Sequence, residues 1–297
     1  MLARPGLPSF EYVRASTSDE VVSLLGEHGD AARLLLGGTD LFAGMRDGLF
    51  SPRVVVDVKH LPGMGEIVYD EDEGLLVGAG ATMNQIASHP DVLAHYPLLA
   101  EAASFVGSYQ LRNRATIGGN VCHASPCADT ALASVVLEGR MLLQGVGGVR
   151  DVPAAEFFRG PGQTALQPGE FLTAVRFPLL PAGAVGRHLK LSRNRLGDLA
   201  VVSVEVLGFA DAGTASGYRF QIGLGSVAPV PLRATDAETV LSTTGPGEQT
   251  LVAAADKAEA AASPIDDVRG SAVYRSAMVR NLTLRGLREV WGRLQAA

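Results

Sequence analysis

Arg114-Ala-Thr-Ile-Gly-Gly-Asn-Val-Cys-His-Ala-Ser-Pro-Cys-Ala-Asp129 lies between two helical patterns of a 297-residue chain. Gly118 and Gly119 predict a loop with close backbone approach, because a side chain at either position would block it. Such a loop can direct several free N–H groups at one anion. Ser125 can cap the following helix, with Pro126 as its first residue, which leaves the positive end of the helix dipole nearby. The stretch therefore predicts a phosphate seat.

A second glycine loop, Leu36-Gly-Gly-Thr-Asp40, follows an apolar run and precedes a short helical pattern over residues 41–46. A glycine pair after a strand is more often a plain turn than a ligand site, so each loop alone has a structural alternative. Together the two loops suit a ligand with two linked phosphates. The first turn of the chain has no G-x-G-x-x-G, and no Walker-type motif occurs, which argues against a nicotinamide-type Rossmann site and a P-loop.

The remaining patterns mix helices and strands in three parts, so we expect an α+β fold. Residues 1–58 alternate strands and helices as a small β-α-β-α-β subdomain, and residues 59–178 form a second subdomain that contains a hairpin and the central stretch. In residues 179–297, three strands of an antiparallel sheet precede three helical patterns. The segment 178–186 is rich in Pro, Gly and Ala and marks the clearest boundary.

Several helix limits can be predicted from capping residues. Thr17-Ser-Asp-Glu20 has the pattern of a capping box, and Thr82 can cap a helix that begins at Met83. The last helix, over residues 271–294, repeats apolar side chains on one side. These side chains are Val273, Ala277, Leu284, Leu287 and Trp291.

The composition of the chain limits the classes of molecule that it can bind. A net charge of −6 argues against nucleic acid and anionic lipid, which need a basic surface. No apolar run approaches the length of a membrane span. The first residues lack the apolar core of a signal peptide, so we expect a cytoplasmic protein.

The two cysteines, Cys122 and Cys127, are the only ones in the chain, and we interpret them as reduced thiols. An iron–sulfur cluster usually needs four ligands, so any such cluster would belong to a partner. No His-rich metal pattern occurs, and the spacing supports no Ser/His/Asp or Cys/His set. We therefore assign no metal ligand and no catalytic residue.

The two glycine loops and several later segments together resemble the FAD-binding subunit of molybdenum hydroxylases. This family includes the medium subunit of carbon monoxide dehydrogenase and the flavin domain of xanthine dehydrogenase. The resemblance covers nearly the whole chain. Its segments are Leu36-Gly-Gly-Thr-Asp40, Thr116-Ile-Gly-Gly-Asn120, Ala124-Ser-Pro with Asp129, residues 160–170, Lys190-Leu-Ser-Arg193, residues 198–203, residues 227–233 and Arg269-Gly-Ser-Ala-Val-Tyr-Arg275.

The resemblance implies a two-subdomain FAD-binding fold of the p-cresol methylhydroxylase/vanillyl-alcohol oxidase type. It also implies a C-terminal domain of the carbon monoxide dehydrogenase flavoprotein type, and FAD as the cofactor. The residues it assigns to FAD binding are Leu35, Leu36, Gly37, Gly38, Thr39, Asp40, Leu41, Phe105, Ala115, Thr116, Ile117, Gly118, Gly119, Asn120, His123, Asp129, Phe171, Leu172 and Lys190.

Three polar residues receive individual interpretations. By resemblance, Asp129 hydrogen-bonds the adenosine part of FAD, although a carboxylate in the first turn of a helix also suits the dipole. Lys190 would lie beside the isoalloxazine ring, where a cation stabilises reduced flavin; otherwise it is a solvated charge. Asn120 offers a donor and an acceptor after the glycines, or serves only as a turn residue.

The other individual interpretations also have structural alternatives. His123 can contact the pyrophosphate of FAD or can be a hydrogen-bonded structural residue. Phe105, Phe171 and Leu172 match positions that pack on FAD in the family, yet such residues often fill a core.

The resemblance also implies partners. A large molybdopterin subunit would oxidise the substrate, and a small [2Fe-2S] subunit would pass electrons to this FAD, in a dimer of heterotrimers. The final acceptor would be NAD, a quinone or oxygen. Two alternatives remain open: a stand-alone FAD oxidoreductase and a cofactor-free assembly scaffold.

Overall fold

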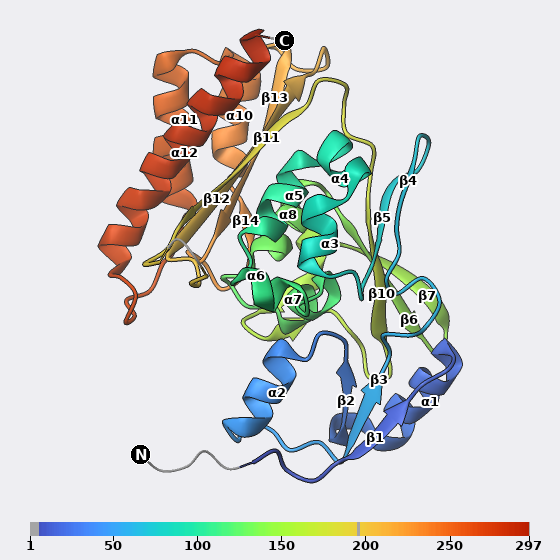
Figure 1. Ribbon diagram of the computed structural model, residues 1–297. Coiled ribbons are helices and arrows are strands. Elements are labelled where there is room, and N and C mark those ends of the chain that lie inside the picture. The colour runs from blue at the N-terminus through green and yellow to red at the C-terminus, as the bar shows by residue number, and fades with distance from the viewer. Residues whose placement is uncertain (1–5, 195–196, 297) are drawn as a thin grey trace.

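Three β-sheets follow one another along the chain in this computed structural model, which describes residues 6–194 and 197–296. They have three, five and four strands, and a two-stranded ribbon accompanies them. Figure 1 shows the first sheet at one end, the helices of the middle region in the centre, and the third sheet with its long helices at the other end. This combination of helices and strands is the α+β fold that the sequence predicts.

The first sheet is parallel, with the strand order β1-β3-β2. Helix α1 begins after Thr17, whose side chain accepts the N–H of Glu20. The Glu20 carboxylate reaches back to the N–H of Ser16, one residue before the expected position of a capping box. The elements are β1 (Glu11–Arg14), α1 (Ser18–His28), the 3-10 turn η1 (Gly29–Ala31), β2 (Ala32–Leu35), α2 (Thr39–Arg46) and β3 (Val54–Asp57).

The second sheet is antiparallel, with the order β4-β5-β10-β6-β7, and the middle helices cover it. Thr82 caps α3 with the reciprocal bonds of a capping box, as expected for this residue. The elements are β4 (Ile67–Asp70), β5 (Gly74–Gly78), α3 (Met83–Ser88), α4 (Pro90–His95), α5 (Pro97–Ser104), α6 (Tyr109–Arg112), α7 (Ile117–His123), α8 (Asp129–Val136), β6 (Arg140–Gly145), β7 (Gly148–Pro153), α9 (Ala154–Phe157), β8 (Phe158–Gly160), β9 (Gln163–Thr164) and β10 (Phe171–Phe177).

The third sheet is antiparallel in the order β11-β12-β13-β14, and it lies between two groups of helices. Helices α10 and α12 contact one side, whereas α5 and α8 of the middle region reach the other (Figure 1). The elements are β11 (Val185–Leu191), β12 (Val202–Ala210), β13 (Tyr218–Gly225), β14 (Leu232–Arg233), α10 (Thr235–Thr244), α11 (Glu248–Ala261) and α12 (Ala272–Ala296).

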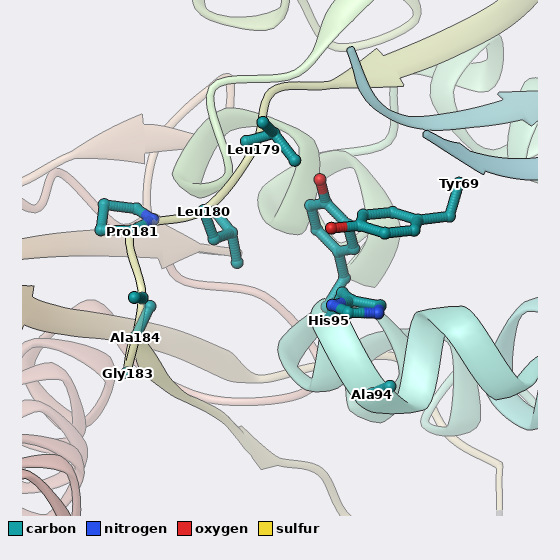
Figure 2. A pocket seen from close by; sticks show the side chains of 10 residues that line it. Tyr69, Ala94, His95, Leu179, Leu180, Pro181, Gly183 and Ala184 are labelled. Carbon is teal, nitrogen blue, oxygen red and sulfur yellow. The ribbon is translucent and has the colours of Figure 1, made fainter. Parts of the chain in front are cut away.

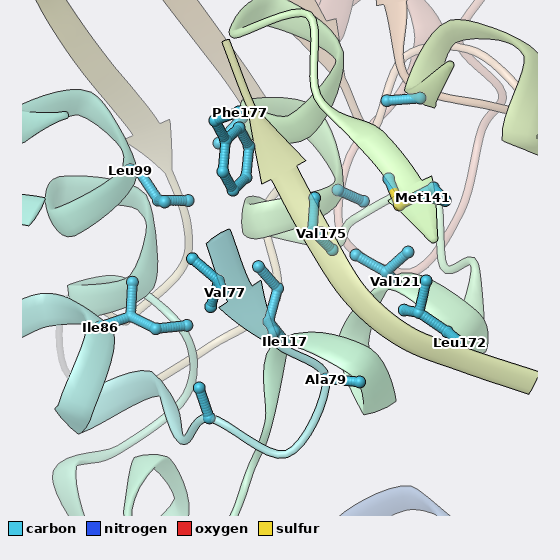
Figure 3. Close-up of a cluster of buried hydrophobic side chains, with 14 of the residues drawn as sticks. Val77, Ala79, Ile86, Leu99, Ile117, Val121, Met141, Leu172, Val175 and Phe177 are labelled. Atoms are coloured by element: carbon cyan, nitrogen blue, oxygen red, sulfur yellow. The ribbon is translucent and has the colours of Figure 1, made fainter. Parts of the chain in front are cut away.

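The main core lies between the second sheet and the middle helices (Figure 3). Val77 of β5 and Val175 of β10 are register partners and are both fully buried. Ile86 of α3 and Leu99 of α5 face them from the helical layer. Each such aliphatic side chain contributes roughly 1.5–3 kcal/mol by leaving water.

In its first turns, the last helix buries a different side from the one that carries the apolar repeat. Val273 is 81% exposed, whereas Val279, Leu287 and Val290 are fully buried. The helix contacts β11 and β12 along a side that is rotated from this repeat. Within that side Arg275 is buried, and its guanidinium donates to the Ser226 carbonyl oxygen at 2.9 Å. A search for apolar residues misses this side of the helix, because an arginine occupies one of its core-facing positions.

Among the described residues, no helix combines the length and the apolar character that a membrane span requires.

Candidate functional site

The two glycine loops touch each other through their backbones. A Cβ atom on Gly37 would lie 2.0 Å from the carbonyl oxygen of Arg114. A Cβ on Gly118 would lie 2.6 Å from the Ala79 carbonyl oxygen and 3.0 Å from a methyl carbon of Leu36. Neither position has room for a side chain, so both glycines are needed for this approach. The two segments that the sequence singles out therefore lie in direct contact.

The central stretch is not the open loop that we expected from its glycines. Thr116 begins helix α7, and its side-chain oxygen accepts the N–H of Gly119 at 3.1 Å. The N–H groups of Ile117 and Gly118 donate to carbonyl oxygens of the segment after β5, at 3.0 and 2.8 Å. These N–H groups are already satisfied within the protein, so the expectation that they point freely at an anion is wrong.

The next helix also begins later than predicted. Helix α8 starts at Asp129, and its N-cap is Ala128, rather than opening at Pro126. Ser125 accepts the N–H of Cys127 at 3.2 Å, so its hydroxyl closes a local turn before the helix. The prediction that Asp129 lies in the first turn of its helix is confirmed.

Among the described residues, the first backbone N–H groups of α2 have no hydrogen-bond acceptor. The first helical hydrogen bond there runs from Phe42 to the Gly38 carbonyl oxygen, at 3.1 Å. The N–H groups of Thr39, Asp40 and Leu41 precede this bond. The N-cap residue, Gly38, has no side chain that could accept a hydrogen bond from them. Gly38 has a φ of 75°, which turns the chain sharply into this helix. Helix N-terminal donors of the kind that an anion site uses therefore occur on the α2 side of the loop contact.

Asp129 and Lys190 form a buried ion pair beside the loops. The distance from Lys190 Nζ to Asp129 Oδ2 is 2.7 Å, and the two side chains are only 4% and 5% exposed. Lys190 also donates to the carbonyl oxygen of Phe105 at 3.0 Å. The sequence assigned Asp129 to the adenosine end of FAD and Lys190 to the ring, yet the structure places their headgroups in contact.

His188 and Glu205 extend this pair into the interior, and sequence reasoning missed both. The distance from His188 Nδ1 to Glu205 Oε1 is 2.8 Å, and His188 Nε2 lies 3.4 Å from Asp129 Oδ1. His188 precedes Lys190 by two positions in β11, so both lie on one side of that strand. The two-residue period of a strand could have indicated that His188 and Lys190 share one side. It could not identify Glu205, which lies on another strand.

The other predicted polar residues occupy different environments. The Asn120 side-chain oxygen accepts from the Thr130 hydroxyl at 2.6 Å, which ties α7 to α8. His123 is exposed in the last turn of α7. Phe171 and Leu172 are 1% and 4% exposed and lie in the main core, which accounts for their apolar character without a ligand.

The remaining predicted residues frame the contact between the loops. Leu35, Ala115 and Ile117 are buried, whereas Leu36 and Leu41 are half-buried. They position the backbone around the glycines and carry no titratable group.

The cysteines are separate thiols. Burial raises the pKa of Cys122 to about 12, so this thiol stays protonated at neutral pH. Cys127 accepts a hydrogen bond from the Arg269 guanidinium, with an N–S distance of 3.4 Å. Across the described ranges, no group of three His, Cys, Asp or Glu residues is arranged to hold a metal ion.

A small pocket of about 160 Å³ lies at residues 179–184, away from the glycine loops (Figure 2). The rings of Tyr69 and His95 stack there with centroids 4.0 Å apart. The Tyr96 hydroxyl donates to the Pro178 carbonyl oxygen at 2.9 Å, and burial raises the pKa of Tyr96 to about 12. These contacts join two parts of the chain, and we assign no ligand to the pocket.

Comparison with known proteins identifies the class to which this geometry belongs. Residues 8–180 match the family described as the FAD binding domain in molybdopterin dehydrogenase, and residues 187–290 match the CO dehydrogenase flavoprotein C-terminal domain. The fold and the site thus define a flavoprotein with an FAD-binding domain and a separate C-terminal domain. The chain belongs to the family of FAD-binding medium subunits of molybdenum hydroxylases.

Individual relatives agree over nearly the full length. The carbon monoxide dehydrogenase medium chain of Hydrogenophaga pseudoflava is 35% identical over 286 residues, 96% of this chain and 98% of the relative. The putative xanthine dehydrogenase FAD-binding subunit of Escherichia coli strain K12 is 30% identical and covers 94% of each chain. A solved carbon monoxide dehydrogenase from H. pseudoflava has a TM-score of 0.91 at 36% identity, with 97% of this chain and 99% of that chain covered. The predicted family, fold class and cofactor are confirmed.

Proposed function

We propose that this chain is the electron-transferring flavin subunit of a three-component molybdenum hydroxylase complex. It would accept electrons from a small [2Fe-2S] subunit and pass them from FAD to an external acceptor, such as NAD, a quinone or oxygen. A large molybdopterin subunit would oxidise the substrate. The contact between the Gly37 and Gly118 segments carries this proposal, because it would let two distant loops bind one FAD.

The diphosphate of FAD would lie at the junction of the two loops. The unbonded N–H groups at the start of α2 and the positive end of its dipole favour an anion there. Gly119 fits such a ligand, because a Cβ at this position meets only Thr116 Oγ1, at 3.2 Å, among the described residues. Core packing therefore does not require glycine at position 119, whereas space for a ligand would.

The Asp129–Lys190 pair would hold the flavin end of the cofactor. Because the two headgroups are 2.7 Å apart, they act on one part of FAD, and we assign both to the isoalloxazine end. Phe105 is 39% exposed beside this pair and supplies an aromatic ring for packing. When bound, FAD supplies the redox chemistry, and these residues bind it and set its electrostatic surroundings.

The chain needs partners for hydroxylase chemistry. Cys122 and Cys127 cannot supply the four ligands of an iron–sulfur cluster. Relatives carry names such as medium chain and FAD-binding subunit, which fit one component of a larger assembly. We propose a dimer of heterotrimers that works in the cytoplasm.

Purification of the tagged chain from its native host tests this proposal. We expect co-purification of two further subunits, with molybdenum, iron and FAD in the same complex. The isolated chain should bind FAD but should not hydroxylate an aromatic or purine substrate. A chain that turned over such a substrate alone would support the stand-alone oxidoreductase, and a chain that bound no flavin in any preparation would support the scaffold.

A further inference from the structure

A buried histidine connects the proposed flavin site to the third sheet. His188 on β11 and Glu205 on β12 are register partners, and their side chains are completely buried. The His188 imidazole lies between two carboxylates, with Nδ1 at 2.8 Å from Glu205 and Nε2 at 3.4 Å from Asp129. The imidazole therefore bridges the Asp129–Lys190 pair and an acidic group in the sheet.

The packing of α8 excludes water from the far end of this bridge. Gly223 of β13 is the register partner of Glu205. A Cβ on Gly223 would lie 2.3 Å from Val136 and 2.9 Å from Leu132, both on α8. The helix therefore lies directly against the sheet beside Glu205. A carboxylate in this position needs a charged or hydrogen-bonded partner, because burial without one is costly.

The charged groups around His188 form two separate sets. Arg187 pairs with Glu101 at 3.0 Å and with Glu289 at 2.9 Å, so these two carboxylates have their own cation. Glu101 also accepts the backbone N–H of His188 at 2.8 Å. The charged groups in contact with His188 are Asp129 of α8, Glu205 of β12 and, through the backbone N–H, Glu101 of α5. Lys190 of β11 pairs with Asp129, and Arg187 joins Glu101 to Glu289 of α12.

With the His188 imidazole protonated and Glu205 ionised, the buried set is neutral. Lys190 and imidazolium then balance Asp129 and Glu205. Burial lowers the pKa of His188, but the neighbouring carboxylates of Asp129 and Glu205 outweigh this effect and raise it to about 9. Burial raises the pKa of Glu205 to about 7. Because the pKa of His188 is raised above neutral, we expect the imidazole to carry a proton at pH 7.

We propose that His188, oriented by Glu205, is a positioning residue that keeps the Asp129 carboxylate directed at the flavin end of the cofactor site. The inference rests on the proposed function. With a second cation behind it, Asp129 is held from both sides, and Lys190 is not its only counter-ion. The His188 ring also packs on Phe105, with centroids 5.3 Å apart, so it supports a second residue of the same site.

Titration of the full-length, flavin-free chain with FAD between pH 6 and pH 9.5 tests this role. We expect the affinity of the wild-type chain to fall as His188 loses its proton. His188→Gln should bind FAD about tenfold more weakly at pH 7, because the variant removes the cation that lies 3.4 Å from Asp129 Oδ1. This variant should lack the pH-dependent step, and Glu205→Gln should shift the step to lower pH. His95→Gln is the matched control, because its exposed ring stacks on Tyr69 and should leave the profile unchanged.

Nitrogen NMR of the imidazole in the flavin-free chain gives a second readout that needs no variant to fold. We expect His188 to be protonated at pH 7, and a neutral ring there would overturn the inference. An unchanged affinity and pH profile in His188→Gln would also overturn it, while the proposed function would stand. A wild-type chain that bound no FAD would instead refute the proposed function, and the NMR titration would still report the charge of His188.

Discussion

The glycine-loop region and the third sheet contribute to the proposed flavin site in different ways. At the loops, backbone contacts backbone at Gly37 and Gly118, so the space at each position decides which residue fits there. At the sheet, Lys190 and His188 contact Asp129 inside the protein, so the charge of each side chain decides which residue fits there. A loop can thus select a ligand by leaving room for it, whereas the sheet must balance every charge that it buries. The two regions should respond differently to substitution and to pH.

Removal of the central carboxylate should produce the largest effect. Asp129→Ala leaves Lys190 and His188 without their shared anion, and breaking a buried pair in this way costs about 4 kcal/mol of unfolding free energy. Chemical denaturation measures the loss. Asp151→Ala, which breaks an exposed pair with Arg140, should cost less than about 1 kcal/mol. Equal losses in the two variants would mean that the buried charges have no special role.

Crowding of the loop contact should have the next largest effect. Gly37→Ala places a methyl group 2.0 Å from the Arg114 carbonyl oxygen, so the two loops must separate. We expect a loss of about 3 kcal/mol together with weak FAD binding. Gly26→Ala is the matched control, because no described atom lies within 4 Å of its added Cβ and the residue is in helix α1. A Gly37→Ala protein as stable as this control would refute the close approach.

The dependence of stability on pH should distinguish the charged region from the loops. Because the folded pKa of His188, about 9, exceeds the ordinary value of 6.5, its contribution is complete below pH 6.5 and is lost as the pH rises towards 9. Across this window, wild-type stability should fall by about 1 kcal/mol per pH unit more than that of His188→Gln. Parallel curves for the two proteins would show that His188 is not charged in the folded state.

The parts of the fold that follow local pattern could be predicted from the sequence. The β-α-β-α-β order, the β4–β5 hairpin and the cap at Thr82 depend on neighbouring residues, and the structure contains them. Helix α7 was missed because two adjacent glycines suggest a loop, whereas Thr116 and contacts with the segment after β5 hold them in a helical turn. The short elements α4, α6, β8 and β9 also depend on tertiary contacts. The predicted limits of the three domains stay a prediction.

The candidate site was predicted in the same uneven way. The two loops were recognised because their glycines lie together in the sequence, and the structure brings them into contact. The contact between Asp129 and Lys190 joins residues 61 positions apart, and no local pattern encodes it. His188 and Glu205 were missed because a strand with one histidine and a strand with one glutamate each look ordinary until the register pairs them.

The flavin content of the purified chain, compared with that of Gly119→Val, tests the central claim that the loop contact forms an FAD site. A Cβ at position 119 meets only Thr116 Oγ1 among the described residues, so the valine should fill the ligand space while the fold persists. We predict equimolar FAD in the wild-type chain, and no flavin in the variant despite an unchanged circular dichroism spectrum. Full flavin occupancy in Gly119→Val, or a wild-type chain that cannot bind FAD, would contradict this account.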